Sequence, residues 1–143
     1  MNDAVLALDK SALEWYNTAA YFKERLVTYM PYIDTVTTVN ITPEQEAHLT
    51  REFGKAIELI SGKSEEWLML NFNGASRMAF RGVSTSDIAM IDVYLFGKAK
   101  DYEYDKLTEK LCETVSSILN VPRNRIYVKY TEQERWGYNG INF

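Results

Sequence analysis

Apolar residues recur with a helical period in the segment that begins at Thr42. Thr42 is a suitable helix N-cap, a proline follows at the first helical position, and Gln45 occupies the capping-box position. Apolar residues then appear three or four positions apart until Gly62, which is a typical helix-ending residue. The apolar anchors of this predicted helix are Leu49, Phe53, Ala56, Ile57 and Ile60.

The same apolar pattern returns 58 residues later in the chain. That shift carries Leu49 onto Leu107, and it carries Ile57 onto Val115. Phe53 maps to Leu111 in the same way, and Ile60 maps to Ile118. The strand-like segments 33–35 and 68–70 shift onto 91–93 and 126–128. The chain therefore contains two strand–helix–strand units, which run over residues 32–72 and 88–130.

A strand–helix–strand crossover places its two strands parallel in one sheet, with the helix on one face. Two such units predict an α+β fold in which two β-α-β pseudo-repeats form a four-stranded sheet with two helices on one face. Parts of the strands, such as "WLMLNF" and "IAMIDVYLF", are apolar on both sides. A sheet that is apolar on both sides needs a second cover. Another subunit is the simplest way to provide it.

Three segments lie outside the two units. Residues 73–82 join them through an Asn-Gly turn, and residues 78–80 could form a short strand. Residues 131–143 are rich in turn formers and aromatic residues and could form a terminal hairpin that packs on a neighbour. In residues 1–30, a capping box and one apolar stripe predict an amphipathic helix. We therefore divide the chain into an N-terminal helical extension, 1–30, and a second domain, 31–143.

Composition narrows the function further. The chain has 143 residues and a formal net charge of −4, which argues against a general nucleic-acid binder. One cysteine and one histidine leave no internal disulfide and no cysteine- or histidine-based metal site. No cofactor is expected. The first ten residues do not form a signal peptide, and no stretch is long enough to span a membrane. The sequence favours a cytoplasmic protein.

Met30-Pro31, followed by a strand-like segment, looks like the opening of a protein placed inside a longer chain. With "ISGKSEEW", "MAF", "LFGK", "VPRNRIYVKY" and "WGYNGINF", it makes residues 31–143 resemble macrophage migration inhibitory factor and its relatives in the tautomerase superfamily. The resemblance implies a homotrimer with an active site between subunits, around a proline at the N-terminus. It also implies a tautomerase that interconverts keto and enol forms of small α-keto acids such as phenylpyruvate.

An N-terminal proline is a secondary amine, whereas an internal proline is a tertiary amide without a basic lone pair. An α-amino group has a pKa of about 7.7–8.0, so it can act as a general base near neutral pH. The resemblance implies that Pro31 is this general base and that Lys63 anchors the substrate carboxylate. It also implies that Tyr127 is a catalytic residue contributed by the adjacent subunit. Substrate-binding positions that match the family are Phe96, Lys129, Trp67 and Tyr138.

The sequence departs from the family pattern at three places. Lys129 replaces a pocket asparagine, Ile88 and Ile91 replace a cysteine pair found in some members, and thirty residues precede Pro31. Structural interpretations remain open. Pro31 could only start a strand, Lys63 follows a helix-ending glycine, Tyr127 could be core or interface packing, and Lys129 fits an ordinary solvated charge. The alternative function is a non-catalytic binding or signalling protein in which the extension blocks Pro31.

Overall fold

The computed structural model describes Lys10, Glu14 and residues 30–142. The helix expected within residues 1–30 lies outside these residues, apart from the two single positions. The strands are β1 (Pro31–Thr37), β2 (Met69–Asn73), β3 (Ala89–Phe96), β4 (Ile126–Gln133), β5 (Gly137–Tyr138) and β6 (Ile141–Asn142). The helices are α2 (Pro43–Ala56) and α3 (Asp101–Leu119), with short 3₁₀ turns η1 (Ile57–Leu59), η2 (Glu65–Trp67) and η3 (Arg123–Arg125).

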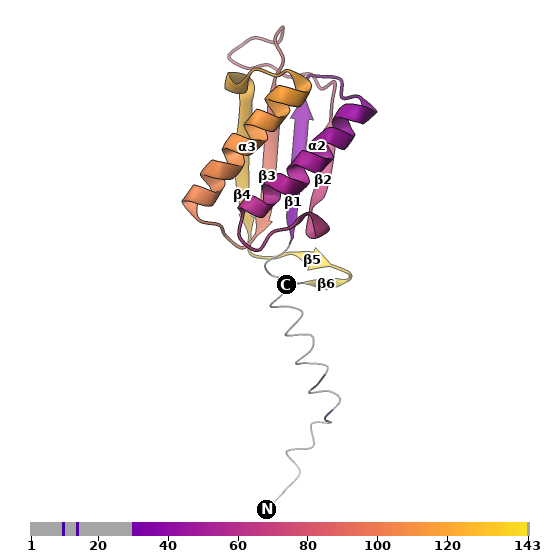
Figure 1. Cartoon of the computed structure of the whole chain (residues 1–143), viewed down its shortest axis with the longest axis vertical. Helices are drawn as coiled ribbons and strands as arrows, with labels where there is room; N and C mark the ends of the chain where they lie inside the picture. The colour runs from indigo at the N-terminus through magenta and orange to yellow at the C-terminus, as the bar shows by residue number, and fades with distance from the viewer. Residues whose placement is uncertain (1–9, 11–13, 15–29, 143) are drawn as a thin grey trace, which may run out of the picture.

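Four strands form one mixed sheet in the order β2-β1-β3-β4. β1 pairs with β2 in parallel, β3 pairs with β4 in parallel, and β1 and β3 meet antiparallel at the centre. Both helices lie against the same face of this sheet (Figure 1). The predicted α+β fold with two β-α-β units is confirmed.

The first helix begins where the sequence predicts. The Oγ1 atom of Thr42 accepts a hydrogen bond from the Gln45 amide at 3.2 Å, and the Gln45 side chain accepts one from the Thr42 amide at 3.0 Å. The helix ends earlier than predicted, because α2 stops at Ala56 and tightens into η1. Gly62 lies beyond both, with a φ of 79°, and it allows the chain to turn.

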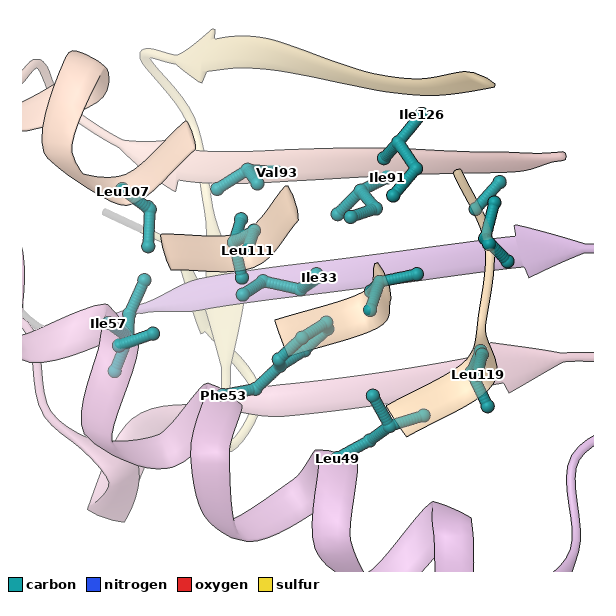
Figure 2. Close-up of a cluster of buried hydrophobic side chains, with 14 of the residues drawn as sticks. Ile33, Leu49, Phe53, Ile57, Ile91, Val93, Leu107, Leu111, Leu119 and Ile126 are labelled. Carbon is teal, nitrogen blue, oxygen red and sulfur yellow. The ribbon is translucent and has the colours of Figure 1, made fainter. Parts of the chain in front are cut away.

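The core lies between the sheet and the two helices, and it uses the repeated anchors (Figure 2). Leu49 and Leu107 are equivalent in the repeat and are both fully buried. Burial of each such side chain contributes about 1.5–3 kcal/mol. The other fully buried large apolar side chains are Ile33, Phe53, Ile57, Ile60, Ile91, Val93, Leu95, Leu111, Val115 and Val121.

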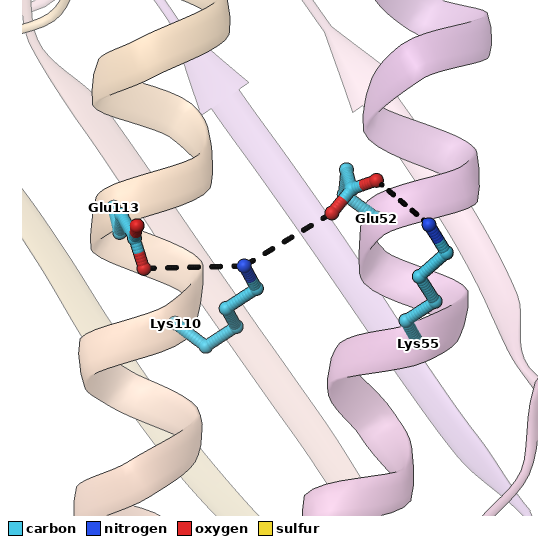
Figure 3. Close-up of polar contacts among 4 residues, drawn as sticks. All are labelled: Glu52, Lys55, Lys110 and Glu113. Atoms are coloured by element: carbon cyan, nitrogen blue, oxygen red, sulfur yellow. Dashed lines mark hydrogen bonds and ion pairs between the residues drawn. The ribbon is translucent and has the colours of Figure 1, made fainter.

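The helices also meet at their solvent-exposed sides. Lys110 of α3 lies 4.0 Å from the carboxylate of Glu52 on α2 and 3.9 Å from Glu113, while Lys55 lies 3.2 Å from Glu52 (Figure 3). These groups are partly or largely exposed, so solvent and salt screen their attraction and they add little to stability.

The sheet face that points away from the helices, here called the open face, is mixed in character. A polar row crosses it, from Asn71 through Asp34 and Asp92 to Lys129, each paired in register with the next. Asn71 donates a hydrogen bond to Asp34 at 2.8 Å, and Lys129 forms an ion pair with Asp92 at 2.8 Å. Apolar side chains flank the row, and Met69 is 67% exposed. We expected the strands to be apolar on both faces of the sheet. On the open face, this expectation is met only beside the polar row.

The prediction of a short strand at residues 78–80 is wrong. Phe80 forms an isolated two-residue bridge with Val83, and the residues between them, Arg81 and Gly82, both have positive φ. Two positive φ values at the centre of a hairpin are typical of a type I′ turn, so the chain reverses here instead of extending. The expected C-terminal hairpin is present, because β5 and β6 pair antiparallel.

Candidate active site

Pro31 is the first residue of β1, and it pairs across the sheet with Leu95 of β3. Proline fits this position because it has no N–H group to offer to a sheet ladder. The preceding residue continues the contact with β3, since the carbonyl of Met30 accepts a hydrogen bond from the Phe96 amide at 3.4 Å. Met30 is only 4% exposed. While Met30 is attached, the nitrogen of Pro31 is an amide nitrogen, and it lies at one end of the sheet.

Lys63 reaches the same end of the sheet from the loop between η1 and η2. Its backbone amide donates to the Ile60 carbonyl at 3.0 Å, and its Nζ donates to the Phe96 carbonyl at 3.0 Å. Phe96 therefore contacts both Met30 and Lys63. Lys63 is 7% exposed, and this burial lowers the pKa of its amine to about 8. Because that pKa is close to neutral, Lys63 is a buried cation that gains or loses its proton within an accessible pH range.

Two aromatic residues, Trp67 and Tyr138, lie near the end of the sheet that holds Pro31 and Lys63. Trp67 belongs to η2, immediately before β2, and β2 begins where Met69 pairs with Tyr32. The ring of Trp67 meets the ring of Tyr138 edge to face, with centroids 5.4 Å apart. The C-terminal hairpin thus packs beside the start of β1. The structure brings together five of the residues predicted from the sequence, namely Pro31, Lys63, Phe96, Trp67 and Tyr138.

Tyr127 does not lie with them in the same chain. It pairs with Met90, five residues along β3 from Leu95, so it lies roughly 16 Å from the Pro31 end of the sheet. Its side chain is 60% exposed, and its ring meets Phe80 edge to face at 5.1 Å. A single copy of the chain cannot bring Tyr127 to Pro31.

Lys129 lies between these two places, on the open face. Its hydrogen bond and ion pair with Asp92 raise the pKa of its amine, so it stays charged and paired within its own sheet. A substrate carboxylate at this position would have to compete with the Asp92 carboxylate for the same amine.

Ser61 and Glu103 lie beside the candidate site, and the sequence analysis did not identify either of them. The carboxylate of Glu103, in the first turn of α3, accepts hydrogen bonds from the amide and the hydroxyl of Ser61 and from the amide of Lys100. The contact with the Lys100 amide, followed by those with Ser61, lowers the pKa of Glu103 to about 2. An acid in the first turn of a helix is ordinary, and it carries no sequence signal of a contact with a loop 42 residues away.

Within the described part of the chain, no group of three or more His, Cys, Asp or Glu residues could hold a metal ion. Among the same described residues, no helix has both the length and the apolar character needed to cross a membrane.

Two parallel strand–helix–strand units joined antiparallel, with a proline at the head of the first strand, form the fold of the tautomerase superfamily. The family model described as "Macrophage migration inhibitory factor (MIF)" matches residues 30–143. The chain belongs to the macrophage migration inhibitory factor family.

Particular relatives agree with this membership. Macrophage migration inhibitory factor of Xenopus laevis is 30% identical over 97 residues, which cover 66% of this chain and 80% of the relative. The crystal structure of Leishmania major MIF2 superimposes with a TM-score of 0.75 at 25% identity, covering 80% of this chain and 98% of that one. The structure of macrophage migration inhibitory factor from Toxoplasma gondii superimposes with a TM-score of 0.72 at 26% identity, covering 78% of this chain and 99% of that one.

Proposed function

We propose that this protein is a tautomerase for small α-keto acids such as phenylpyruvate, and that Pro31 is its general base once the nitrogen of Pro31 is a free amine. The observation that carries the proposal is the common location of Pro31 and the buried amine of Lys63, which both contact the segment Leu95–Phe96. A base and a cation at one end of a sheet are the two groups that keto–enol chemistry needs.

The reaction requires no cofactor. The free amine of Pro31 takes a proton from the carbon beside the keto group, and the electron pair of the C–H bond forms the carbon–carbon double bond while the π pair of the carbonyl moves to oxygen. The protonated amine then returns the proton to that oxygen, which gives the enol and restores the free base. Lys63 holds the substrate carboxylate and stabilises the negative charge that develops. A cation beside the amine also lowers the pKa of that amine, which keeps Pro31 unprotonated near neutral pH.

A homotrimer is part of the proposal. Tyr127 is exposed at the end of the sheet opposite Pro31, so only another copy can bring it to the site. Exposed apolar side chains on the open face, such as Met69, would be covered in such an assembly. Phe96, Trp67 and Tyr138 would form the substrate pocket, and Lys129 would add a second cation if Asp92 releases it.

One observation favours a second candidate function, a non-catalytic binding or signalling protein. Met30 is buried, and its carbonyl continues the pairing between β1 and β3, so the residue that acylates Pro31 belongs to the folded structure. While that peptide bond is intact, the nitrogen of Pro31 has no basic lone pair. The two candidates differ only in the state of one bond.

Phenylpyruvate tautomerisation by two forms of the protein tests the proposal. One form is the full chain, and the other begins at Met30, so that removal of the initiator methionine frees the proline amine. We expect activity in the short form and little or none in the full chain, with intact mass confirming both N-termini.

Pro31→Ala provides the control in each form. It should remove most of the activity of the short form and change nothing in the full chain. Equal activity in the two forms would show that another residue is the base. An inactive short form with a confirmed free proline would favour the binding protein.

A further inference from the structure

The carboxylate of Glu103 connects two segments that are far apart in the sequence. One oxygen accepts hydrogen bonds from the Ser61 amide at 2.9 Å and from the Ser61 hydroxyl, while the other accepts one from the Lys100 amide at 2.8 Å. Glu103 is only 3% exposed, although it is ionised. A buried carboxylate is tolerated where hydrogen-bond donors surround it. Here two of the three donors belong to the loop that leads to Lys63.

This loop needs an attachment of that kind. Gly62 separates Ser61 from Lys63, and its positive φ of 79° is a conformation that few other residues adopt. The side chain of Lys63 is long and strongly hydrated when free, so keeping it buried costs energy that the surrounding structure must offset. The hydrogen bond from Nζ to the Phe96 carbonyl holds one end of the side chain. The Ser61–Glu103 contacts hold the backbone two residues before it.

We propose that Glu103 is a positioning residue for Lys63: it fixes the loop 60–63 so that the Lys63 amine stays buried against Phe96, beside Pro31. The catalytic consequence of this arrangement rests on the proposed tautomerase function, while the positioning itself does not.

A simpler role for Glu103 would be that of a cap at the start of α3. The contact with the Lys100 amide is sufficient for capping. The two contacts from Ser61 are not part of the helix cap. Ser61 follows η1 in the first strand–helix–strand unit, whereas α3 belongs to the second unit. A cap and a positioning residue therefore make different predictions for Lys63.

The protonation of Lys63 in the full-length chain distinguishes the two roles. In uniformly ¹³C-labelled protein, the Cε shift of Lys63 is followed against pH and is assigned by its absence in Lys63→Arg. Glu103→Ala should release the loop, expose the amine and make Lys63 at least about tenfold easier to protonate. Ser61→Ala, which removes one of the two donors, should have a smaller effect in the same direction. A direct charge effect has the opposite sign, because loss of a nearby carboxylate makes an amine harder to protonate.

Two further variants complete the test. Glu103→Gln keeps an oxygen that can accept from Ser61, so it should leave Lys63 closer to wild type than Glu103→Ala does. Thr42→Ala removes the cap of α2 far from the loop and should lower the melting temperature without moving the Lys63 titration.

The proposal is overturned if wild-type Lys63 titrates as an ordinary exposed lysine. It is equally overturned if Glu103→Ala and Ser61→Ala leave the titration unchanged, or if Thr42→Ala moves it as much. Should Glu103→Ala fail to fold, Ser61→Ala and Glu103→Gln decide the outcome alone. All these measurements are made without substrate, so an inactive short form with a free Pro31 amine would refute the tautomerase function and leave this result standing.

Discussion

Replacing Lys63 by methionine should stabilise the protein at neutral pH, because the substitution removes a buried charge and keeps a side chain of similar length. A pKa of about 8, instead of 10.5, means that protonated Lys63 costs the folded state about 3 kcal/mol. Loss of the hydrogen bond from Nζ to the Phe96 carbonyl subtracts about 1 kcal/mol. Lys63→Met should therefore raise the free energy of unfolding at pH 7 by about 2 kcal/mol.

The gain should depend on pH in a defined direction. Between pH 8 and pH 10.5 the unfolded chain binds more protons at Lys63 than the folded chain does. The wild-type protein therefore becomes relatively more stable as pH rises through this window, and the advantage of Lys63→Met should shrink. Urea unfolding at pH 7 and pH 10, at one protein concentration, measures both values.

Lys98→Met is a matched control, since Lys98 is exposed and lies two residues from Phe96. It should change stability by little at either pH. The reasoning is refuted if Lys63→Met is less stable than wild type at pH 7, or if its advantage is the same at both pH values. Stabilisation by removal of Lys63 would show that the residue is kept at this position at a cost to the fold.

Other predictions concern the candidate site, the oligomeric state and the stability of the fold at acidic pH. In the form that begins at Met30, Lys63→Ala should raise KM for a keto acid by the equivalent of about 1.5–3 kcal/mol, with a smaller drop in kcat; an unchanged KM would remove Lys63 from the site. Tyr127→Phe should have a milder effect in the same assay, since it loses a hydroxyl and keeps the ring, and an effect larger than that of Lys63→Ala would contradict this order. Light scattering at micromolar concentration should give the mass of a trimer, and a monomer mass would refute the assembly. The pKa of Glu103, about 2, predicts that its stabilisation is complete above about pH 4.5 and is lost as pH falls toward 2; acid titrations of unfolding should show a weaker dependence in Glu103→Gln, and identical curves would argue against these hydrogen bonds.

The main architecture was predictable from the sequence because it rests on periodic burial. The equivalence of Leu49 and Leu107 identified both helices and, with the adjacent strand segments, the two strand–helix–strand units. Local turn chemistry was harder. Residues 78–80 contain apolar residues that favour a strand, but Arg81 adopts a positive φ that no propensity for arginine would indicate.

The site was predictable only in part, because its residues come from different segments. Pro31 and Lys63 were proposed from the family resemblance, and the structure places both at one end of the sheet. The contact between Glu103 and Ser61 depends on how α3 packs against the loop after η1, and sequence periodicity carries no information about such a pair. The pairing of Lys129 with Asp92 follows from strand register, which the sequence analysis did not assign.

The hydrogen bond between the Met30 carbonyl and the Phe96 amide has a consequence for any event that cleaves the chain before Pro31. In the language of synthesis, Met30 is a protecting group on the proline nitrogen, and the same residue masks a second functional group, the N–H of Phe96. Hydrolysis of one peptide bond would unmask both together, an amine able to take a proton and an amide able to donate to an oxygen. Because Phe96 also holds Lys63 through its carbonyl, the unmasked groups would lie beside a cation that is already in place.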